Sequence, residues 1–306
     1  MKLGVLGAHG MLGQAVVAHL RSLGLPHLAA GRQEVDITAH DAVRTFAGDH
    51  SLSHLLNCAA FAKVDACEEP AAQAEADAVN GLAPGLVAAA AQALAIPCLH
   101  VSSDYVFAGD AQVPYDEDAT CAPLGAYGRS KHLGEQRFWA ALGPQPTAAA
   151  YLVRTSWLFG HGGPNFVATM LRLFAQRAEV RVVADQFGRP TYCNDLAAAL
   201  VQLLCRPAAA GTYHFANLGS TSWHGFAAAI LAGARHLGLP LRCTAVQPIG
   251  SEEYPTPARR PAFSVLWTEK ITAALGDEPA TWQTALSRYL MQESETVVPT
   301  TSAARA

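Results

Sequence analysis

The sequence carries little charge and no run of basic residues. Only 15% of its 306 residues are charged, and 25 acidic residues outnumber 21 lysines and arginines, for a formal net charge of −4. Proteins that bind nucleic acid in general present a basic stripe or patch, which this chain lacks. We therefore expect no nucleic-acid partner, and a polyanionic ligand would need local arginines rather than a global positive field.

Paired cysteines and membrane signals are also missing. The seven cysteines are odd in number and form no Cys-x-x-Cys pair, so neither a disulfide framework nor a cysteine metal site is predicted. The apolar neighbours of Cys58 and Cys205 are typical of buried free thiols in a reducing compartment. The N-terminus does not have the form of a signal peptide, and no apolar run reaches membrane-spanning length. We expect a cytoplasmic protein with no membrane partner.

The first half of the chain alternates short apolar runs with helical stretches. Strands are expected at residues 2–6, 28–30, 55–58, 98–102 and 151–155, and the intervening stretches have helical periodicity, with Thr38 as the expected cap of the second helix. This alternation predicts an α/β fold, a doubly wound parallel sheet of the Rossmann type. We expect residues 1–156, with a return of part of 180–220, to form a dinucleotide-binding domain, 157–291 a smaller α/β substrate-binding lobe, and 292–306 a disordered tail.

A glycine-rich turn follows the first expected strand. Gly7, Gly10 and Gly13 are spaced Gly-x-x-Gly-x-x-Gly and open a helix. Such glycines let the backbone approach a pyrophosphate at the helix N-terminus, although a tight turn without a ligand explains the same spacing. After the second strand, Arg32 favours NADPH because a guanidinium pairs with the 2′-phosphate, and the alternative is an exposed loop arginine. Residues 36–37 (Asp36 and Ile37) lie where such folds hold adenine, or Asp36 is a plain turn residue.

A tyrosine and a lysine four residues apart form the candidate catalytic pair. Tyr127 and Lys131 lie on one face of an expected helix, where a lysine ammonium lowers the pKa of a tyrosine hydroxyl. Ser103 follows the fourth strand, where open parallel sheets bind ligands, and its hydroxyl suits a carbonyl oxygen. Together the three residues predict proton donation to a ketone during hydride transfer. The alternatives are exposed helix residues and a simple turn at Ser103.

These residues resemble the extended short-chain dehydrogenases and reductases, and more specific strings narrow the resemblance to the dTDP-4-dehydrorhamnose reductase family. The match spans about residues 1–291 and both halves of the chain. Its strings are SDYVF at 103–107, PYDE at 114–117, YGRSK at 127–131, RTSWLFG at 154–160, NF at 165–166, DQFGRPT at 185–191, GTYHF at 211–215 and ARRP at 258–261.

The resemblance implies an activity and the residues for it. The implied reaction is reduction of the C4 ketone of dTDP-4-dehydro-L-rhamnose to dTDP-L-rhamnose by NADPH, with NADH as the alternative. Tyr127 would donate the proton, Lys131 would bind the nicotinamide ribose, and Ser103 stands where the family usually has threonine. The implied cofactor contacts beyond these are Gly10, Met11, Leu12, Ala60, Phe61, Ala62 and Val101, and the implied substrate contacts are Ser103, Asp104 and Trp157.

Polar residues of the second half are further candidates for the nucleotide sugar. Guanidinium groups suit phosphate oxygens, so Arg154, Arg189, Arg259 and Arg260 are candidates to hold the diphosphate, with a surface salt bridge as the alternative for each. Asn165 and Gln186 are candidates for sugar hydroxyls, or cap loops instead. Trp157 is equally compatible with a core position.

Two other functions remain open from the sequence. One is a reductase or epimerase of another nucleotide sugar. The other is a non-catalytic NADP-binding subunit, because the regulatory subunit of methionine adenosyltransferase resembles the same family. Some family members form a magnesium-dependent dimer through acidic residues, and the sequence does not identify which residues here would match those acids. We therefore name no metal ligand, and a role for magnesium and the choice between monomer and homodimer stay open.

Overall fold

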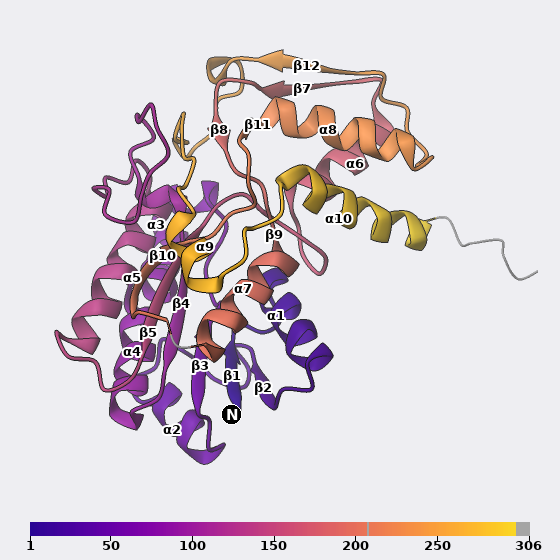
Figure 1. The fold of residues 1–306 in the computed structure, drawn as a ribbon. Coiled ribbons are helices and arrows are strands. Elements are labelled where there is room, and N and C mark those ends of the chain that lie inside the picture. The colour runs from indigo at the N-terminus through magenta and orange to yellow at the C-terminus, as the bar shows by residue number, and fades with distance from the viewer. Residues whose placement is uncertain (207, 298–306) are drawn as a thin grey trace, which may run out of the picture.

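A six-stranded parallel sheet forms the centre of the lower part of the molecule (Figure 1). The computed structural model describes residues 1–206 and 208–297. The strand order is β10-β5-β4-β3-β1-β2, so the order reverses between β1 and β3. Open α/β sheets bind ligands outside the carboxyl ends of strands at such a reversal. The strands are β1 (Leu3–Leu6), β2 (His27–Ala30), β3 (His54–Asn57), β4 (Cys98–Ser103), β5 (Ala150–Thr155) and β10 (Gly211–His214).

Helices cover both faces of this sheet. Alternate strand residues enter two different cores, with Leu3 and Val5 on the side of α1, α7 and α9, and Leu6 on the side of α2, α4 and α5. Both faces are therefore apolar, as expected for a parallel sheet. The helices are α1 (Met11–Ser22), α2 (Ala42–Asp49), α3 (Pro70–Ala76), α4 (Ala83–Leu94), α5 (Ala126–Leu142), α7 (Cys193–Cys205) and α9 (Glu269–Leu275), with a π-helix at Asp77–Leu82 between α3 and α4 and short 3-10 helices at Asp65–Glu68 and Asp104–Val106.

A smaller group of elements lies beyond the carboxyl ends of the strands, at the top of Figure 1. It has its own hydrophobic core, which includes Phe159, Phe226 and Tyr289. Ser222 caps α8 by accepting a hydrogen bond from the Gly225 N–H. The elements are β6 (Leu158–Phe159), α6 (Phe166–Gln176), β7 (Glu179–Val183), β8 (Phe187–Gly188), β9 (Thr191–Tyr192), β11 (Thr221–Ser222), α8 (Trp223–His236), β12 (Ala245–Ile249), a 3-10 helix (Ser251–Glu253) and α10 (Trp282–Val297).

The predicted fold class is confirmed, and two local predictions are wrong. Thr38 does not cap α2, because its N–H and its hydroxyl both donate to the Asp36 carboxylate, and the helix begins at Ala42 instead. The tail expected from residue 292 is helical as far as Val297, because α10 packs against the core of the smaller group through Leu286 and Leu290. The remainder of that tail, 298–306, lies outside the described residues.

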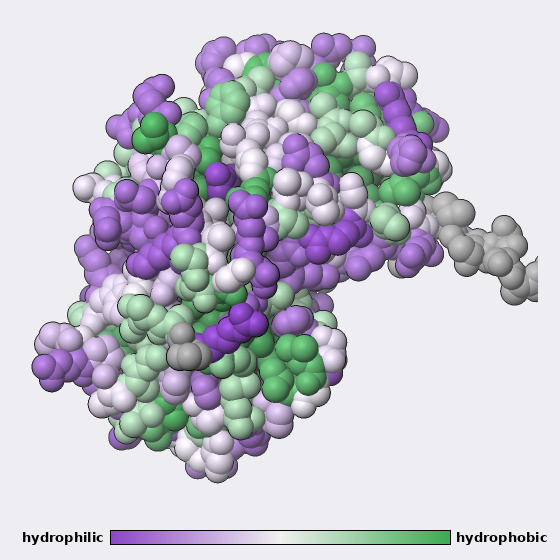
Figure 2. Space-filling model, in the orientation of Figure 1, coloured by the Kyte–Doolittle hydropathy of each residue, from purple (hydrophilic) through white to green (hydrophobic). Residues whose placement is uncertain are grey.

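The surface in Figure 2 mixes hydrophilic and hydrophobic residues over both parts of the molecule. Exposed apolar side chains such as Val113 and Met291 come from separate elements. In the part of the chain that the structure describes, every helix falls short of the length and apolar character that a membrane crossing needs.

Candidate active site

The turn between β1 and α1 requires glycine at two positions. Gly7 has a φ of +74°, and a Cβ there would lie 2.5 Å from the backbone nitrogen of Ala59. A Cβ on Gly13 would lie 2.2 Å from the carbonyl oxygen of Gly7. These close approaches bring the first turn of α1, with its unpaired N–H groups, up to the ends of β1 and β3. That is the arrangement which holds a pyrophosphate in dinucleotide-binding folds.

A cavity of about 560 Å³ opens beside this turn. Its wall comes from the glycine turn, the segment after β2, the segment after β3, and Glu75 on α3. The size suits an organic ligand, since such sites commonly measure roughly 300–1,000 Å³. The predicted cofactor residues in the wall are Gly7, Gly10, Arg32, Asp36, Ile37, Ala60 and Phe61.

Other predicted cofactor residues lie outside this wall. Leu12 is buried in the core between α1 and the sheet. Val101 is also buried, but its carbonyl oxygen accepts a hydrogen bond from the Lys131 ammonium at 2.8 Å. The structure therefore brings Val101 to the catalytic pair rather than to the cavity. The predicted cofactor residues outside the cavity wall are Met11, Leu12, Gly13, Ala62, Val101, Tyr127 and Lys131.

The carboxyl end of β4 meets the first turns of α5. Gly128 permits this contact, because a Cβ there would lie 2.2 Å from the Tyr105 carbonyl oxygen. Tyr127 packs edge-on against Tyr105, with 5.4 Å between the ring centroids. The Ser103 hydroxyl donates to the Asp104 carboxylate at 3.0 Å. Ser103 and Tyr127, which were predicted from separate motifs, thus stand together, with Lys131 one turn further along α5.

Burial dominates the protonation of the catalytic pair. It raises the pKa of Tyr127, and a hydrogen bond with the Ser103 hydroxyl offsets only part of that shift. Burial also lowers the pKa of Lys131 to about 8, against the opposing effect of the Glu135 carboxylate. Burial sets the net direction of the Tyr127 pKa, and the lowering effect expected of Lys131 stays a prediction. In this structure the Lys131 ammonium donates to the Val101 carbonyl oxygen.

Asp104 is a buried carboxyl directly beside Ser103. It is 1% exposed, and burial raises its pKa to about 6 although the neighbouring Ser264 and Ser103 hydroxyls favour the charged form. A carboxyl in this state exchanges a proton near neutral pH. Such a perturbed group at the end of a strand is typical of a functional site.

Sequence analysis missed the buried ion pair beneath the catalytic helix. Arg154 was a candidate for the substrate diphosphate, but its guanidinium pairs with the Glu135 carboxylate inside the protein. Burial alone would raise the pKa of Glu135, but the His132 ring, 3.9 Å away, and the hydrogen-bonded Arg154 guanidinium hold that pKa at about 2. The pair ties β5 to α5, the helix that carries Tyr127 and Lys131. Arg154 therefore supports the site from inside the protein.

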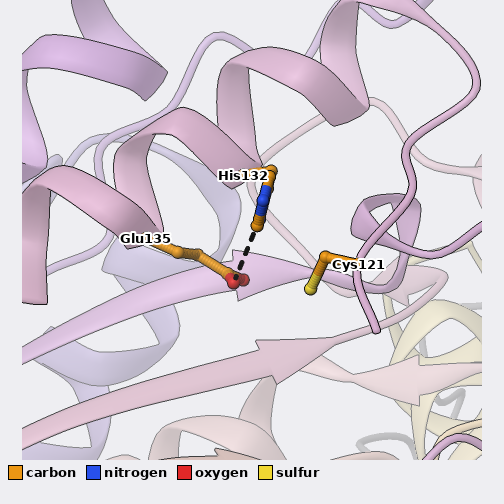
Figure 3. Close-up of side chains that lie close together, drawn as sticks. All are labelled: Cys121, His132 and Glu135. Atoms are coloured by element: carbon orange, nitrogen blue, oxygen red, sulfur yellow. Dashed lines mark ion pairs between the residues drawn. The ribbon is translucent and has the colours of Figure 1, made fainter. Parts of the chain in front are cut away.

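Cys121, His132 and Glu135 form a cluster with metal-ligand atoms close together (Figure 3). The Arg154 guanidinium already contacts two of them, because it donates to both Glu135 oxygens and to the Cys121 sulfur at 3.3 Å. A cation there would lie beside this buried positive charge and would break the ion pair. The donor set therefore does not fit a metal ion, and only Glu135 among its three residues offers the oxygen ligands that magnesium prefers.

Trp157 occupies a constrained position at the start of the smaller group. Its φ of +46° is rare for a bulky residue, and its ring stacks on Trp223 with 3.5 Å between centroids and 6° between planes. A Cβ on Gly188 would lie 2.4 Å from the Trp157 ring. Neighbours on two elements therefore fix the indole, and an unusual backbone held in this way often marks a ligand site.

The other predicted substrate residues have protein partners. Asn165 caps α6 by accepting from the Ala168 N–H, and its amide donates to two backbone carbonyls. Gln186 donates to the Ser251 hydroxyl. Arg260 forms a two-point ion pair with Asp65. In this structure these side chains therefore serve as local caps or ion-pair partners, the alternatives given for them from the sequence. None of the three lies in the cavity wall.

Asn80 is a site residue that sequence analysis missed. It is fully buried in the π-helix between α3 and α4. Its side chain accepts from the Phe61 N–H at 2.9 Å and donates to the Phe61 carbonyl at 3.0 Å. These two bonds fix the backbone of the cavity wall after β3. The only sequence signal is a single asparagine in an alanine-rich helical stretch, which no local rule separates from an exposed residue.

Comparison with known protein families gives a match along nearly the whole chain. The model for the RmlD substrate binding domain matches residues 1–295. The chain belongs to this family. A dTDP-4-dehydrorhamnose reductase from Streptomyces griseus is 42% identical over 290 residues, covering 92% of this chain and 91% of that protein. The reductase of the same name from Burkholderia thailandensis is 40% identical, covering 94% and 97%.

A solved structure shares the fold of this family member. The dTDP-4-dehydrorhamnose reductase from Bacillus anthracis, in complex with NADP, superposes with a TM-score of 0.86 at 33% identity. The match covers 95% of this chain and 99% of that one. Sequence and structure therefore agree on the family, from the glycine turn through most of α10.

Proposed function

We propose that this protein is an NADPH- or NADH-dependent reductase that converts the C4 ketone of dTDP-4-dehydro-L-rhamnose into the alcohol of dTDP-L-rhamnose. One observation carries the proposal. In a chain of this family, the Ser103 hydroxyl at the end of β4 contacts Tyr127 on α5, and Lys131, one turn further along α5, donates to the Val101 carbonyl oxygen on β4. A binding subunit has no chemical need for all three groups, so this set favours an enzyme over the non-catalytic alternative.

The cavity beside the glycine turn fits the dinucleotide. The close approaches at Gly7 and Gly13 hold the first turn of α1 against the ends of β1 and β3, which is where the pyrophosphate lies in such folds. We place the cofactor on residues 1–156 and the returning strand within 180–220, and the nucleotide sugar against residues 157–291. The stacked Trp157 supports this placement of the sugar, because its ring is held at the entrance to the smaller group.

The residues divide the chemistry between them. When bound, the reduced nicotinamide supplies the hydride. Tyr127 gives its hydroxyl proton to the ketone oxygen, and its raised pKa keeps that proton in place at neutral pH until the transition state. Ser103 orients the same oxygen through its hydroxyl. Lys131 is charged below about pH 8 and holds the nicotinamide ribose beside Tyr127.

The test is a coupled assay with purified protein and freshly made dTDP-4-dehydro-L-rhamnose. Loss of the near-ultraviolet absorbance of NADPH or NADH, together with dTDP-L-rhamnose as the product, is the expected result. The D-gluco keto-sugar should be included, because a relative from Streptomyces niveus, 37% identical, is named dTDP-4-keto-6-deoxy-D-glucose reductase. Faster turnover of that substrate would move the assignment to another nucleotide sugar. Cofactor binding without turnover of either sugar would contradict the enzyme.

A further inference from the structure

The adenosine end of the cavity carries one guanidinium beside a carboxylate. Arg32 is the only lysine or arginine in the cavity wall among the described residues. Its NH1 lies 3.1 Å from Glu75 Oε1, and Glu75 also belongs to the wall. The two residues are 43 positions apart, so local sequence rules do not pair them.

The end of the second strand, where dinucleotide-binding folds usually place the carboxylate that binds the adenosine ribose, has no carboxylate in this chain. Dinucleotide-binding folds place an acidic residue at the end of the second strand, where it binds the 2′-hydroxyl. Here β2 ends at Ala30 and Gly31 follows. Glu34 is engaged elsewhere, because its carboxylate accepts from the Gly31 N–H at 2.7 Å and contacts His9.

Asp36 is also engaged in local structure. Its carboxylate accepts from the N–H and the hydroxyl of Thr38. Among the residues that the structure describes, the cavity wall thus holds two carboxylates, Asp36 and Glu75, and only Asp36 is bonded to its own loop. The hydrogen bond of Glu75 in this structure goes to Arg32. Glu75 reaches the cavity from α3 and stands in for the acid that β2 lacks.

We propose that Glu75 sets the preference between NADPH and NADH by competing with the 2′-phosphate for Arg32. The inference rests on the proposed placement of the dinucleotide in this cavity. With a 2′-phosphate present, Arg32 leaves Glu75 and pairs with the phosphate oxygens. Without it, the ion pair stays and Glu75 accepts a hydrogen bond from the ribose 2′-hydroxyl. One exposed pair thus supplies the recognition group for each cofactor.

The exposure of the pair suits this exchange. The side chains of Arg32 and Glu75 are 79% and 47% exposed. Solvent screens such a pair, so breaking it costs little compared with a buried pair. The carboxylate nevertheless adds a negative charge close to the 2′-phosphate, whose own charge is about −1.5 to −2 near neutral pH. Removing that carboxylate should therefore favour the phosphorylated cofactor.

The test measures binding of two fragments to the full chain by isothermal titration calorimetry. The probes are 2′,5′-ADP, which carries the 2′-phosphate, and 5′-AMP, which carries the free hydroxyl. Glu75→Gln should bind 2′,5′-ADP about fivefold more tightly and 5′-AMP more weakly, since an exposed pair is worth at most about that factor. Arg32→Gln should weaken 2′,5′-ADP roughly tenfold and leave 5′-AMP within about twofold.

Two further variants isolate the pair. In the Arg32→Gln background, adding Glu75→Gln should no longer produce the fivefold gain, because the partner that it releases is gone. Glu69→Gln is the matched control, since Glu69 is exposed at the start of α3 and makes no side-chain cap bond. It removes the same charge and should leave both affinities within about twofold.

Three outcomes would overturn the proposal. Equal changes for both fragments in Glu75→Gln, or no change, would show that Glu75 does not discriminate the 2′-phosphate. If Glu69→Gln changed the two affinities as much as Glu75→Gln, the cofactor preference would come from the summed negative charge of α3 rather than from Glu75. Failure of the unaltered protein to bind either fragment would remove the cavity placement and this inference, while the reductase assay would decide the catalytic proposal separately.

Discussion

Arg154 on β5 holds Glu135 on α5 through two hydrogen bonds, with Nε 2.9 Å from Oε1 and NH2 2.8 Å from Oε2. The two side chains are 8% and 5% exposed. Buried charges of this kind depend on each other, because neither finds water when its partner is removed. The pair therefore connects the stability of the sheet to the position of α5, the helix that carries the proposed catalytic residues.

Glu135→Gln should lower the free energy of unfolding by about 3–5 kcal/mol, since it leaves a buried guanidinium without its counter-charge. Urea unfolding followed by circular dichroism measures this. Glu253→Gln is the matched control, because Glu253 pairs with Arg181 at the surface and both are well exposed. That variant should lose less than about 1 kcal/mol. Equal losses in the two variants would show that the buried pair contributes no more than a surface pair.

Tyr127→Phe should lower turnover by roughly 10²–10⁴-fold, the usual contribution of a general acid. NADPH binding, measured by calorimetry, should change little because the hydroxyl serves the ketone rather than the dinucleotide. Tyr151→Phe is the control, since its hydroxyl only bonds the Ala208 carbonyl at the far end of the sheet. Full activity in Tyr127→Phe would reject this residue as the proton donor.

Stability should fall in acid partly through His214. Burial lowers the pKa of His214 to about 3, and the charge of Arg154 acts in the same direction. In the unfolded chain this pKa is near 6.5. The folded value lies below the unfolded one, so the unfolded state binds a proton first as pH falls. The contribution of neutral His214 is complete above about pH 6.5 and is lost as the pH falls towards 3.

His214→Gln removes this titration. Its melting temperature should therefore fall less steeply than that of the unaltered protein between roughly pH 6.5 and pH 4, even if it starts lower. Thermal unfolding across this range measures the slope. His236→Gln, an exposed change at the end of α8, should keep the original slope. Parallel curves for His214→Gln and the unaltered protein would contradict the assigned protonation.

Trp223→Leu should disturb the sugar site through Trp157. Loss of the stacked partner removes about 0.5–1.5 kcal/mol of ring interaction, so KM for the nucleotide sugar should rise roughly 2- to 13-fold with a smaller change in kcat. Near-ultraviolet circular dichroism should lose the signal of the coupled indoles. Trp267→Leu, which removes a half-exposed ring elsewhere, should leave KM unchanged. An unaltered KM together with a lost dichroism signal would show that the stack is structural only.

Local sequence patterns predicted the parts of the site that depend on backbone geometry. The alternation of strands and helices predicted the parallel sheet. The glycine spacing predicted the tight turn after β1, which the structure places where the strand order reverses. Tyr127 and Lys131 were identified because a spacing of four residues places two side chains on one helix face. These features need only neighbouring residues and fixed backbone periods.

Tertiary structure alone decided which distant partners the charged side chains of the site take. Arg154 and Arg260 were both candidates for phosphate, yet one pairs with Glu135 and the other with Asp65, far away in the sequence. Arg32 meets Glu75 only because α3 returns to the cavity wall. The pKa of Tyr127 rises because of burial, which a spacing rule does not contain, and the nearby charge of Asp104 acts in the same direction. Helical and strand periods are local properties of the chain, whereas desolvation and ion pairing depend on which distant segments the fold brings together.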